Sequence, residues 1–460
     1  MDTNINSTLP VAIIGAGPVG LAAASHLLTK GEQVLIFEAG DQAGANILKW
    51  SNVRMFSPWE YNIDKASRQL LESNGWVEPN KNELPTGGEL VKQYLRPLSE
   101  VPEIKKVLHV NTKVVGIARK GLDKVKDKNR ENLPFEIYVE QNGKQRIFKA
   151  KAVIDATGTW SNPNPVLSSG IWTSSESSLK DKVFYGIPDI FTGRSRYAGK
   201  KVMVVGSGHS SINAILELGK LKQEEPGTEI IWVIRKEKIQ DVYGGQEKDG
   251  LPARGELGIR VQKLVDSGNV QVYNTFHIQE LIEDNQKITV SGISRDNEET
   301  IYGIDEIITA TGARPDLSFL REIRINLDPA IESVAELAPL IDPNIHSCGT
   351  VRPHGEKELR QPEKDFYVVG MKSYGRAPTF LLATGYEQVR SIVAYLTGDF
   401  EGAKDVQLEL PETGVCSISF ASKQTDSCST VSCETVEERV AVSCCTDSKE
   451  PEELSPYCCG

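Results

Sequence analysis

The chain has 460 residues, of which 39% are hydrophobic and 25% are charged, and its formal net charge is −11. This length and composition predict two or three domains with hydrophobic cores. An acidic chain without a basic cluster argues against a nucleic acid partner. The longest charge-poor run, residues 9–28, contains glycine and proline and follows no basic segment, so it predicts neither a membrane span nor a signal peptide. We therefore expect a cytoplasmic protein without a membrane partner.

The first predicted element is a strand–helix–strand unit over residues 11–38. A buried strand runs directly into a Gly-x-Gly-x-x-Gly turn, and an Ala/Leu-rich helix and a second strand follow. The three glycines allow a tight turn, close approach of the backbone to a pyrophosphate, and close packing of helix on strand. The acid that ends the second strand is placed to accept hydrogen bonds from ribose hydroxyls. This pattern predicts a dinucleotide site that contains Gly15, Gly17, Gly20 and Glu38.

Several weaker signals follow this unit. Residues 54–61 form an aromatic stretch, and Thr86 with Glu89 fits a helix N-cap and capping box as well as a ligand site. Alternating runs on either side of Asn142-Gly143 predict a β-hairpin. A buried strand over residues 152–155 then leads into Ala-Thr-Gly, which places Thr157 and Gly158 directly after its end.

The same order of elements then recurs, which is informative about architecture. A buried strand over residues 201–205 is followed by Gly206-x-Gly208-x-x-Ser211, a helix over residues 212–221 and a second strand. Short strands near residues 276, 288 and 301 precede another buried strand and a second Ala-Thr-Gly, which ends at Gly312. The repeat predicts two nucleotide-binding domains in one chain, whereas two unrelated Rossmann-like units are the alternative.

Basic residues end the second unit where an acid ends the first. Arg235 and Lys236 suit the 2′-phosphate of NADPH, because an acid at this position favours a free 2′-hydroxyl. A solvated pair of charges at the strand end is the alternative. His209 lies within the second glycine turn, where it either faces a nicotinamide or fills the loop.

A last strand over residues 365–370 contains Gly370, and a helix from about residue 381 to 396 follows it. Residues 405–460 contain eleven Asp/Glu against three Lys/Arg and show little periodicity, so we expect most of this tail to be disordered. The predicted fold is α/β with two Rossmann-like domains, the second inserted in the first, and a Cys-rich tail. The expected boundaries are 9–165 and 319–400 for the first domain, 166–318 for the inserted domain and 401–460 for the tail.

These motifs make residues 10–400 resemble the flavoproteins that have two dinucleotide-binding domains. Among these flavoproteins, the chain resembles the flavin-containing monooxygenase-like branch. The resemblance implies that the first fingerprint binds FAD and the second binds NADPH. It also implies that Thr157, Gly158, Gly312 and Gly370 lie beside the cofactors. Many relatives have Gly-Asp where this chain has Gly370-Met371, so contact of this segment with the ribityl chain is not carried over.

Two comparisons narrow the branch. Disulfide reductases of this superfamily carry a redox Cys pair near the flavin, whereas residues 1–347 contain no cysteine. The FxGxxxH signature of one monooxygenase class is only partly present at residues 184–190. The segments FSPWEYNID, LPTGGEL, GSGHSS and MKSYGRAPTFLLATGYEQVRS resemble flavoproteins found in arsenic-resistance gene clusters.

The resemblance implies an FAD enzyme that oxidises NADPH and oxygenates a soft nucleophile, a small-molecule substrate, through a flavin hydroperoxide. The resemblance to arsenic-cluster flavoproteins further implies a role in metalloid detoxification. A flavin reductase without oxygenation is one alternative, and a thiol-based protein that binds metal or metalloid is another. No catalytic residue is identified from the sequence. The adjacent pairs Cys444-Cys445 and Cys458-Cys459 in the tail are candidate ligands for a soft metal or metalloid such as As(III), and an unselected low-complexity tail is the alternative reading.

Overall fold

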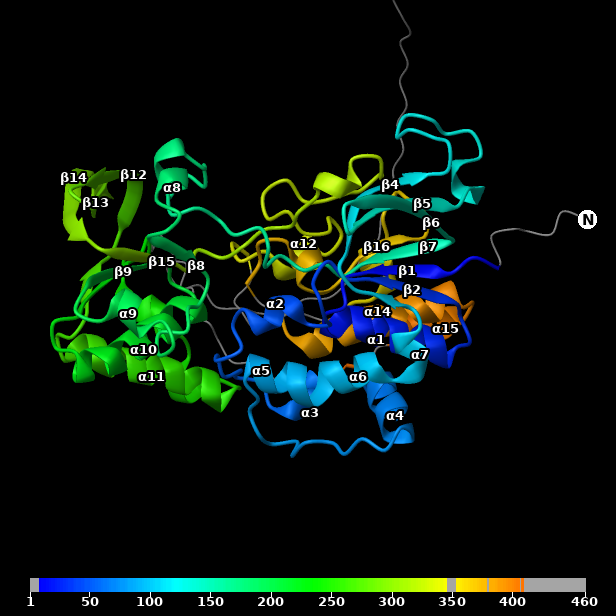
Figure 1. Ribbon diagram of the computed structural model, residues 1–460, viewed down its shortest axis with the longest axis horizontal. Coiled ribbons are helices and arrows are strands. Elements are labelled where there is room, and N and C mark those ends of the chain that lie inside the picture. The colour runs from blue at the N-terminus through cyan, green and yellow to red at the C-terminus, as the bar shows by residue number, and fades with distance from the viewer. Residues whose placement is uncertain (1–7, 346–352, 379, 406, 409–460) are drawn as a thin grey trace, which may run out of the picture. The chain divides into compact units, whose positions relative to one another are not determined.

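The computed structural model describes residues 8–345, 353–378, 380–405 and 407–408. Two five-stranded parallel sheets form the framework, and each is accompanied by a three-stranded antiparallel sheet (Figure 1). Among the described residues, no helix is both long and apolar enough to cross a membrane.

The first parallel sheet has the strand order β16-β7-β1-β2-β3 and unites the two ends of the described chain. Its apolar strands pair in register, so Asp155 at the end of β7 lies between Ile14 of β1 and Val368 of β16. The strands are β1 (Val11–Ile14), β2 (Val34–Phe37), β3 (Leu108–His109), β7 (Ala152–Asp155) and β16 (Phe366–Val368).

Successive residues along each strand of this sheet point to opposite faces, and both faces are covered, as expected for a parallel sheet. Ile13 faces α1 (Pro18–Thr29), which packs against α14 (Leu382–Leu396). On the opposite face, Phe37 and Phe366 contact rings of the antiparallel sheet formed by β4 (Thr112–Arg119), β5 (Phe135–Gln141) and β6 (Lys144–Ala150). The remaining helices of this half are α2 (Ala45–Leu48), α3 (Trp59–Asn62), α4 (Lys65–Ser73), α5 (Gly87–Leu90), α6 (Arg96–Glu100), α7 (Pro102–Lys105), α12 (Ala338–Ile341), α13 (Glu356–Leu359) and α15 (Phe400–Lys404).

The second parallel sheet has the order β11-β10-β9-β15-β8 and is made from the middle of the chain. One face packs Val202, Val204 and Trp232 against α10 and α11, and the other packs Met203 and Val233 against the antiparallel sheet. The elements of this half are α8 (Ser174–Ser178), β8 (Val183–Tyr185), α9 (Arg194–Tyr197), β9 (Lys201–Val205), α10 (His209–Glu224), β10 (Glu229–Val233), α11 (Pro252–Asp266), β11 (Gln271–Tyr273), β12 (Phe276–Asp284), β13 (Lys287–Ser294), β14 (Asn297–Ile304) and β15 (Glu306–Thr309).

The chain crosses between the two halves twice, and the two crossing segments are hydrogen-bonded to each other. The N–H of Asn164 donates to Gly312 O at 3.0 Å, and its side chain donates to Thr311 O at 3.1 Å. The N–H of Arg314 donates to Asn162 O at 3.0 Å. The second domain is therefore inserted through a paired double linker, in agreement with the predicted fold class.

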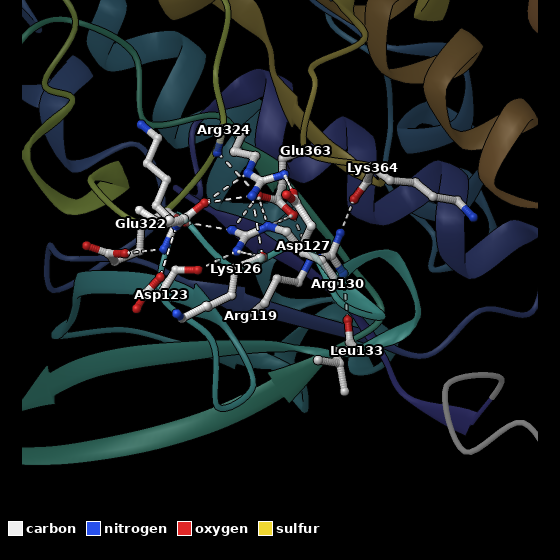
Figure 2. Close-up of polar contacts among 12 residues, drawn as sticks. Arg119, Asp123, Lys126, Asp127, Arg130, Leu133, Glu322, Arg324, Glu363 and Lys364 are labelled. Carbon is white, nitrogen blue, oxygen red and sulfur yellow. Dashed lines mark hydrogen bonds and ion pairs between the residues drawn. The ribbon is translucent and has the colours of Figure 1, made fainter. Parts of the chain in front are cut away.

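A buried charge cluster ties the two sequence segments of the first half together (Figure 2). Glu363 is 2% exposed and accepts from Arg119 Nε at 2.8 Å and Arg130 Nη2 at 2.7 Å. The backbone N–H of Arg324 donates to the same carboxylate at 3.2 Å. Burial alone would raise the pKa of Glu363, but hydrogen bonds from Arg130 and Arg119 outweigh it and lower the pKa.

Most predicted elements agree with the structure, and the differences have local causes. The hairpin at Asn142-Gly143 is β5–β6, and both turn residues have positive φ, as a type I′ turn requires. The sequence analysis missed β4, which completes that sheet, and α11. It also began the helix α10 three residues late, at residue 212 instead of His209.

Candidate functional site

The first glycine turn forms an open cradle at the N-terminus of α1. Gly15 has φ +97°, and a Cβ on it would lie 2.8 Å from Ala156 O. A Cβ on Gly20 would lie 1.9 Å from Gly15 O, so the helix can approach the strand only without a side chain there. A Cβ on Gly17 would meet nothing within 4 Å. The space before the free N–H groups of α1 therefore has room for a pyrophosphate, which the helix dipole favours.

Glu38 stabilises this cradle directly. Its Oε2 accepts the N–H of Ala16 at 2.8 Å, and its Oε1 accepts the N–H of Gly40 at 2.8 Å. Each carboxylate oxygen retains a lone pair after one such bond. The side chain is half-buried at the carboxyl end of β2. Binding of a ribose hydroxyl by Glu38 thus remains a prediction, and the structure adds a second role in shaping the loop.

Thr157 and Gly370 lie at the same edge of the first sheet as the glycine turn. A Cβ on Gly15 would lie 3.2 Å from Thr157 Cα, so the first Ala-Thr-Gly turn packs on the glycine turn. Gly370 has φ +66°, and a Cβ on it would lie 3.3 Å from Val19 of α1. The structure therefore brings together Gly15, Gly17, Gly20, Thr157 and Gly370.

The second glycine turn repeats the first with one change. Gly206 has φ +127°, and a Cβ on it would lie 2.3 Å from Ala310 O. The indole of Trp232 donates to Gly206 O at 2.7 Å, and this hydrogen bond stabilises the turn. Gly208 is open, as Gly17 is. Ser211 takes the place of the third glycine, and its buried hydroxyl donates to Gly208 O at 2.7 Å.

The two ATG turns differ in their neighbours. Gly158 and Gly312 both have positive φ, at +67° and +85°, which a glycine adopts without strain. Gly312 is bonded to Asn164 of the other linker. These two predicted residues therefore sit at the points where the chain leaves and re-enters the first half.

The basic residues after β10 differ in what holds them. Arg235 is exposed, whereas the ammonium of Lys236 donates to Asp241 O at 2.8 Å within its own loop. An ammonium has three donors, so this bond leaves two for a phosphate. Neither assignment is tested by these contacts.

His209 is the first residue of α10 and is partly buried against Phe56, with ring centroids 5.4 Å apart. Burial, with a smaller contribution from nearby Arg254, lowers the pKa of His209 to about 4, and Asp249 partly offsets both effects. The imidazole is therefore neutral at pH 7. It has the polarity to face a nicotinamide, although the contact with Phe56 equally fits the alternative of a packed loop residue.

The sequence analysis did not predict one polar pair at this edge of the first sheet. Asp155, the last residue of the strand predicted over residues 152–155, forms an ion pair of 2.6 Å with Lys372, and both side chains are fully buried. The signal available in the sequence was a single acid at the end of an otherwise apolar strand.

Among the described residues, no group of three or more His, Cys, Asp or Glu side chains could hold a metal ion. The predicted ligands Cys444, Cys445, Cys458 and Cys459 lie outside the described residues, as does the predicted tail beyond residue 408. Two residues of the aromatic stretch differ in environment. Trp59 is 2% exposed and packs in the core, whereas Tyr61 is half-buried.

Comparisons with known proteins agree with this architecture. A family profile described as pyridine nucleotide-disulphide oxidoreductase matches residues 12–347. The chain is 23% identical over 343 residues to a ferredoxin–NADP reductase of Lactobacillus johnsonii, which covers 74% of the chain and 85% of the relative. It is 24% identical over 245 residues to a flavin-containing monooxygenase of Arabidopsis thaliana, FMO GS-OX-like 7, covering 46% of the chain and 47% of the relative.

Two solved structures share the fold at lower identity. The bacillithiol disulfide reductase of Bacillus cereus aligns with a TM-score of 0.61 at 21% identity, covering 85% of the chain and 99% of the reductase. The FAD-bound cadaverine monooxygenase of Erwinia amylovora aligns with a TM-score of 0.59 at 12% identity, covering 89% and 100%. At these identities the two structures show a shared fold and leave the reaction open.

Proposed function

Because the chain belongs to the pyridine nucleotide-disulphide oxidoreductase family, we propose that it is an NADPH-dependent flavin monooxygenase that oxygenates a small soft nucleophile. The family and its relatives are FAD-dependent oxidoreductases, so the chain is an enzyme of that class, with FAD and NADPH as its cofactors. The flavin, when bound, supplies the redox chemistry, and the protein supplies binding, orientation and electrostatics.

We assign FAD to the first glycine turn and NADPH to the second. The open space at Gly17 and the acid at Glu38 support the first assignment. The open space at Gly208 and the exposed Arg235 support the second. The corresponding domains are residues 9–165 with 319–400 for FAD, 166–318 for NADPH and 401–460 for the tail.

The observation that carries the proposal is the absence of cysteine from residues 1–347. Reduction of a disulfide by a protein dithiol requires a Cys pair beside the flavin, and no residue of this segment can form one. A reduced flavin here has no core disulfide to reduce, so its electrons pass to another acceptor or to O₂. Similarity to a plant flavin-containing monooxygenase favours O₂.

A reductase without oxygenation is the second candidate. It is favoured by the similarity to ferredoxin–NADP reductase, which extends over 85% of that relative. In this case the electrons pass to an acceptor, and O₂ is reduced only to H₂O₂.

The two candidates are distinguished by whether O₂ is incorporated into a product or is released as H₂O₂. NADPH oxidation, O₂ consumption and H₂O₂ release are measured with sulfides, amines, N-hydroxylatable amines and trivalent arsenicals as substrates. The monooxygenase proposal predicts one oxygenated product per NADPH consumed with at least one of these classes, and little H₂O₂. Stoichiometric H₂O₂ with every class, and no oxygenated product, would contradict it.

The tail suggests a metalloid role, which we propose separately. Seven of the eight cysteines follow residue 415, and two adjacent pairs can offer thiolates to a soft ion such as As(III). Thiols stay reduced in the cytoplasm, where we propose that the protein works.

Deletion of residues 409–460 tests this role and leaves Gln407, whose N–H donates to Glu387 at 3.1 Å, in place. We expect the truncated protein to retain FAD and basal NADPH oxidation but to lose tight As(III) binding. Replacing only Cys444, Cys445, Cys458 and Cys459 by Ser is the matched control for tail length. Unchanged As(III) binding in both variants would show that the tail has no role in it.

A further inference from the structure

Lys372 is buried in a place where a lysine is costly. Its side chain is 0% exposed, and its ammonium lies 2.6 Å from Asp155 Oδ2, which is equally buried. The same ammonium donates to the hydroxyl of Thr157 at 3.1 Å and lies 4.5 Å from the centroid of the Phe319 ring. Each buried charge costs several kcal/mol of desolvation, and an apolar pair of the same shape is often at least as stable. Stability alone therefore does not explain this pair.

Both members of the ion pair are hydrogen-bonded to Thr157. Asp155 Oδ1 accepts the N–H of Thr157 at 3.1 Å and its hydroxyl at 2.7 Å. Because Lys372 bonds both to Asp155 and to the Thr157 hydroxyl, this hydroxyl lies between the two charged groups and is hydrogen-bonded to each. Asp155 itself is fixed at the end of β7, where its carbonyl accepts the N–H of Val369 at 2.9 Å.

Thr157 in turn packs on the first glycine turn, since a Cβ on Gly15 would lie only 3.2 Å from its Cα. Lys372 also belongs to the turn that begins at Gly370. The N–H of Gly370 donates to Gln388 Oε1 of α14 at 2.7 Å. One ammonium therefore connects the three segments that carry the candidate FAD residues Gly15, Thr157 and Gly370.

We propose that Lys372 is a positioning residue of the FAD site. Through Asp155 and the Thr157 hydroxyl, it fixes the Ala-Thr-Gly turn against the glycine cradle and the Gly370 turn. The site is thereby held in its binding geometry before the cofactor arrives, which reduces the cost of ordering on binding. The inference rests on the proposed placement of FAD at the first glycine turn.

The test uses three variants of the full-length protein and measures FAD affinity, the visible spectrum of bound flavin and Tm. Lys372→Met leaves a buried carboxylate unpaired, and Asp155→Asn leaves a buried ammonium unpaired. Asp155→Asn with Lys372→Met removes both charges at nearly constant volume. Lys404→Met is the control, because Lys404 is 73% exposed and pairs with Glu401 on the surface.

We expect Lys372→Met to weaken FAD binding at least tenfold and to lower Tm. The double variant should recover Tm while keeping the tenfold loss of affinity and a shifted flavin spectrum. If the double variant recovers affinity and spectrum together with Tm, the pair is only structural and the inference is wrong. Should Lys372→Met fail to fold, the double variant alone decides the question.

A Gly17→Val variant separates this inference from the proposed function. If Gly17→Val retains its FAD, the placement of FAD is wrong, and the proposed role of Lys372 is then wrong as well. If Gly17→Val loses FAD while the double variant binds FAD normally, the placement stands and the role of Lys372 is wrong.

Discussion

The two halves of the molecule have the same kind of parallel sheet but are held together differently. In the first half, ion pairs between residues more than 200 positions apart are buried, as in Arg119–Glu363 and Asp155–Lys372. In the inserted half, Arg194 pairs with Glu224 and Glu225 at the surface.

The difference follows from how each half is made. The first half is assembled from two segments of sequence that the inserted half separates, so its neighbouring strands β7 and β16 pair only if residues distant in sequence meet. Buried ion pairs are directional and tolerate few alternative partners, which makes them suited to specifying such a junction. The inserted half is continuous, and its buried ion pair, Arg254–Asp249, joins residues only five positions apart.

The largest predicted effect on stability is at the centre of the cluster in Figure 2. Glu363→Gln leaves Arg119 and Arg130 without a buried counter-charge, which should cost about 3–5 kcal/mol of unfolding free energy. Urea denaturation of the FAD-loaded protein measures it. A loss no larger than that of a surface variant would contradict the special role of buried pairs in the discontinuous half.

The same residue gives a pH signature. The pKa of Glu363 is lowered in the folded protein, so its contribution to stability is complete above its unfolded value of 4.5. The contribution is lost as pH falls below 4.5 through the lowered folded value. The difference in Tm between the wild-type protein and Glu363→Gln should therefore shrink on acidification below pH 4.5. A difference that is constant with pH would show that the carboxylate charge is not responsible.

A smaller effect is expected on cofactor choice in the inserted half. Arg235→Ala removes a charge-assisted bond to the 2′-phosphate, worth about 1.5–3 kcal/mol, or roughly tenfold to a hundredfold in KM for NADPH. KM for NADH should change little. Lys220→Ala is the control, because Lys220 is exposed and pairs with Glu217 on the surface of the same half. An equal rise of KM for both cofactors would assign Arg235 to structure and not to the phosphate.

The smallest predicted effect is at the surface of the inserted half. Arg194→Gln breaks exposed ion pairs with Glu224 and Glu225. Since exposed pairs contribute little, Tm should stay within experimental error of the wild-type value. A loss as large as that of Glu363→Gln would remove the contrast between the halves.

Local sequence patterns predicted the parts of the fold that are local. Both strand–helix–strand units were recognisable because short apolar strands run directly into glycine turns with fixed spacing. The helix α11 was missed because Gly255 and Gly258 interrupt its pattern. Both glycines are required there, since a Cβ would lie 2.0 Å from Gln246 O and 1.8 Å from Tyr243 O, respectively.

The long-range contacts of the site could not be predicted. Nothing near Asp155 in the sequence indicates a lysine 217 positions later, and the partner becomes visible only when β16 is placed beside β7. The open cradles, in contrast, were predictable, because Gly17 and Gly208 occupy the fingerprint positions where backbone meets pyrophosphate.

The assignment of one cofactor to each glycine turn is tested most directly by a matched pair of variants, Gly17→Val and Gly208→Val. Each places a branched side chain in a space that is open in the structure. Bound FAD and the rate of flavin reduction by NADPH are measured for both purified proteins. We predict that Gly17→Val contains no FAD, whereas Gly208→Val keeps a full complement of FAD that NADPH no longer reduces. A Gly17→Val protein with its full yellow cofactor, or a Gly208→Val protein whose flavin is reduced at the wild-type rate, would contradict the assignment.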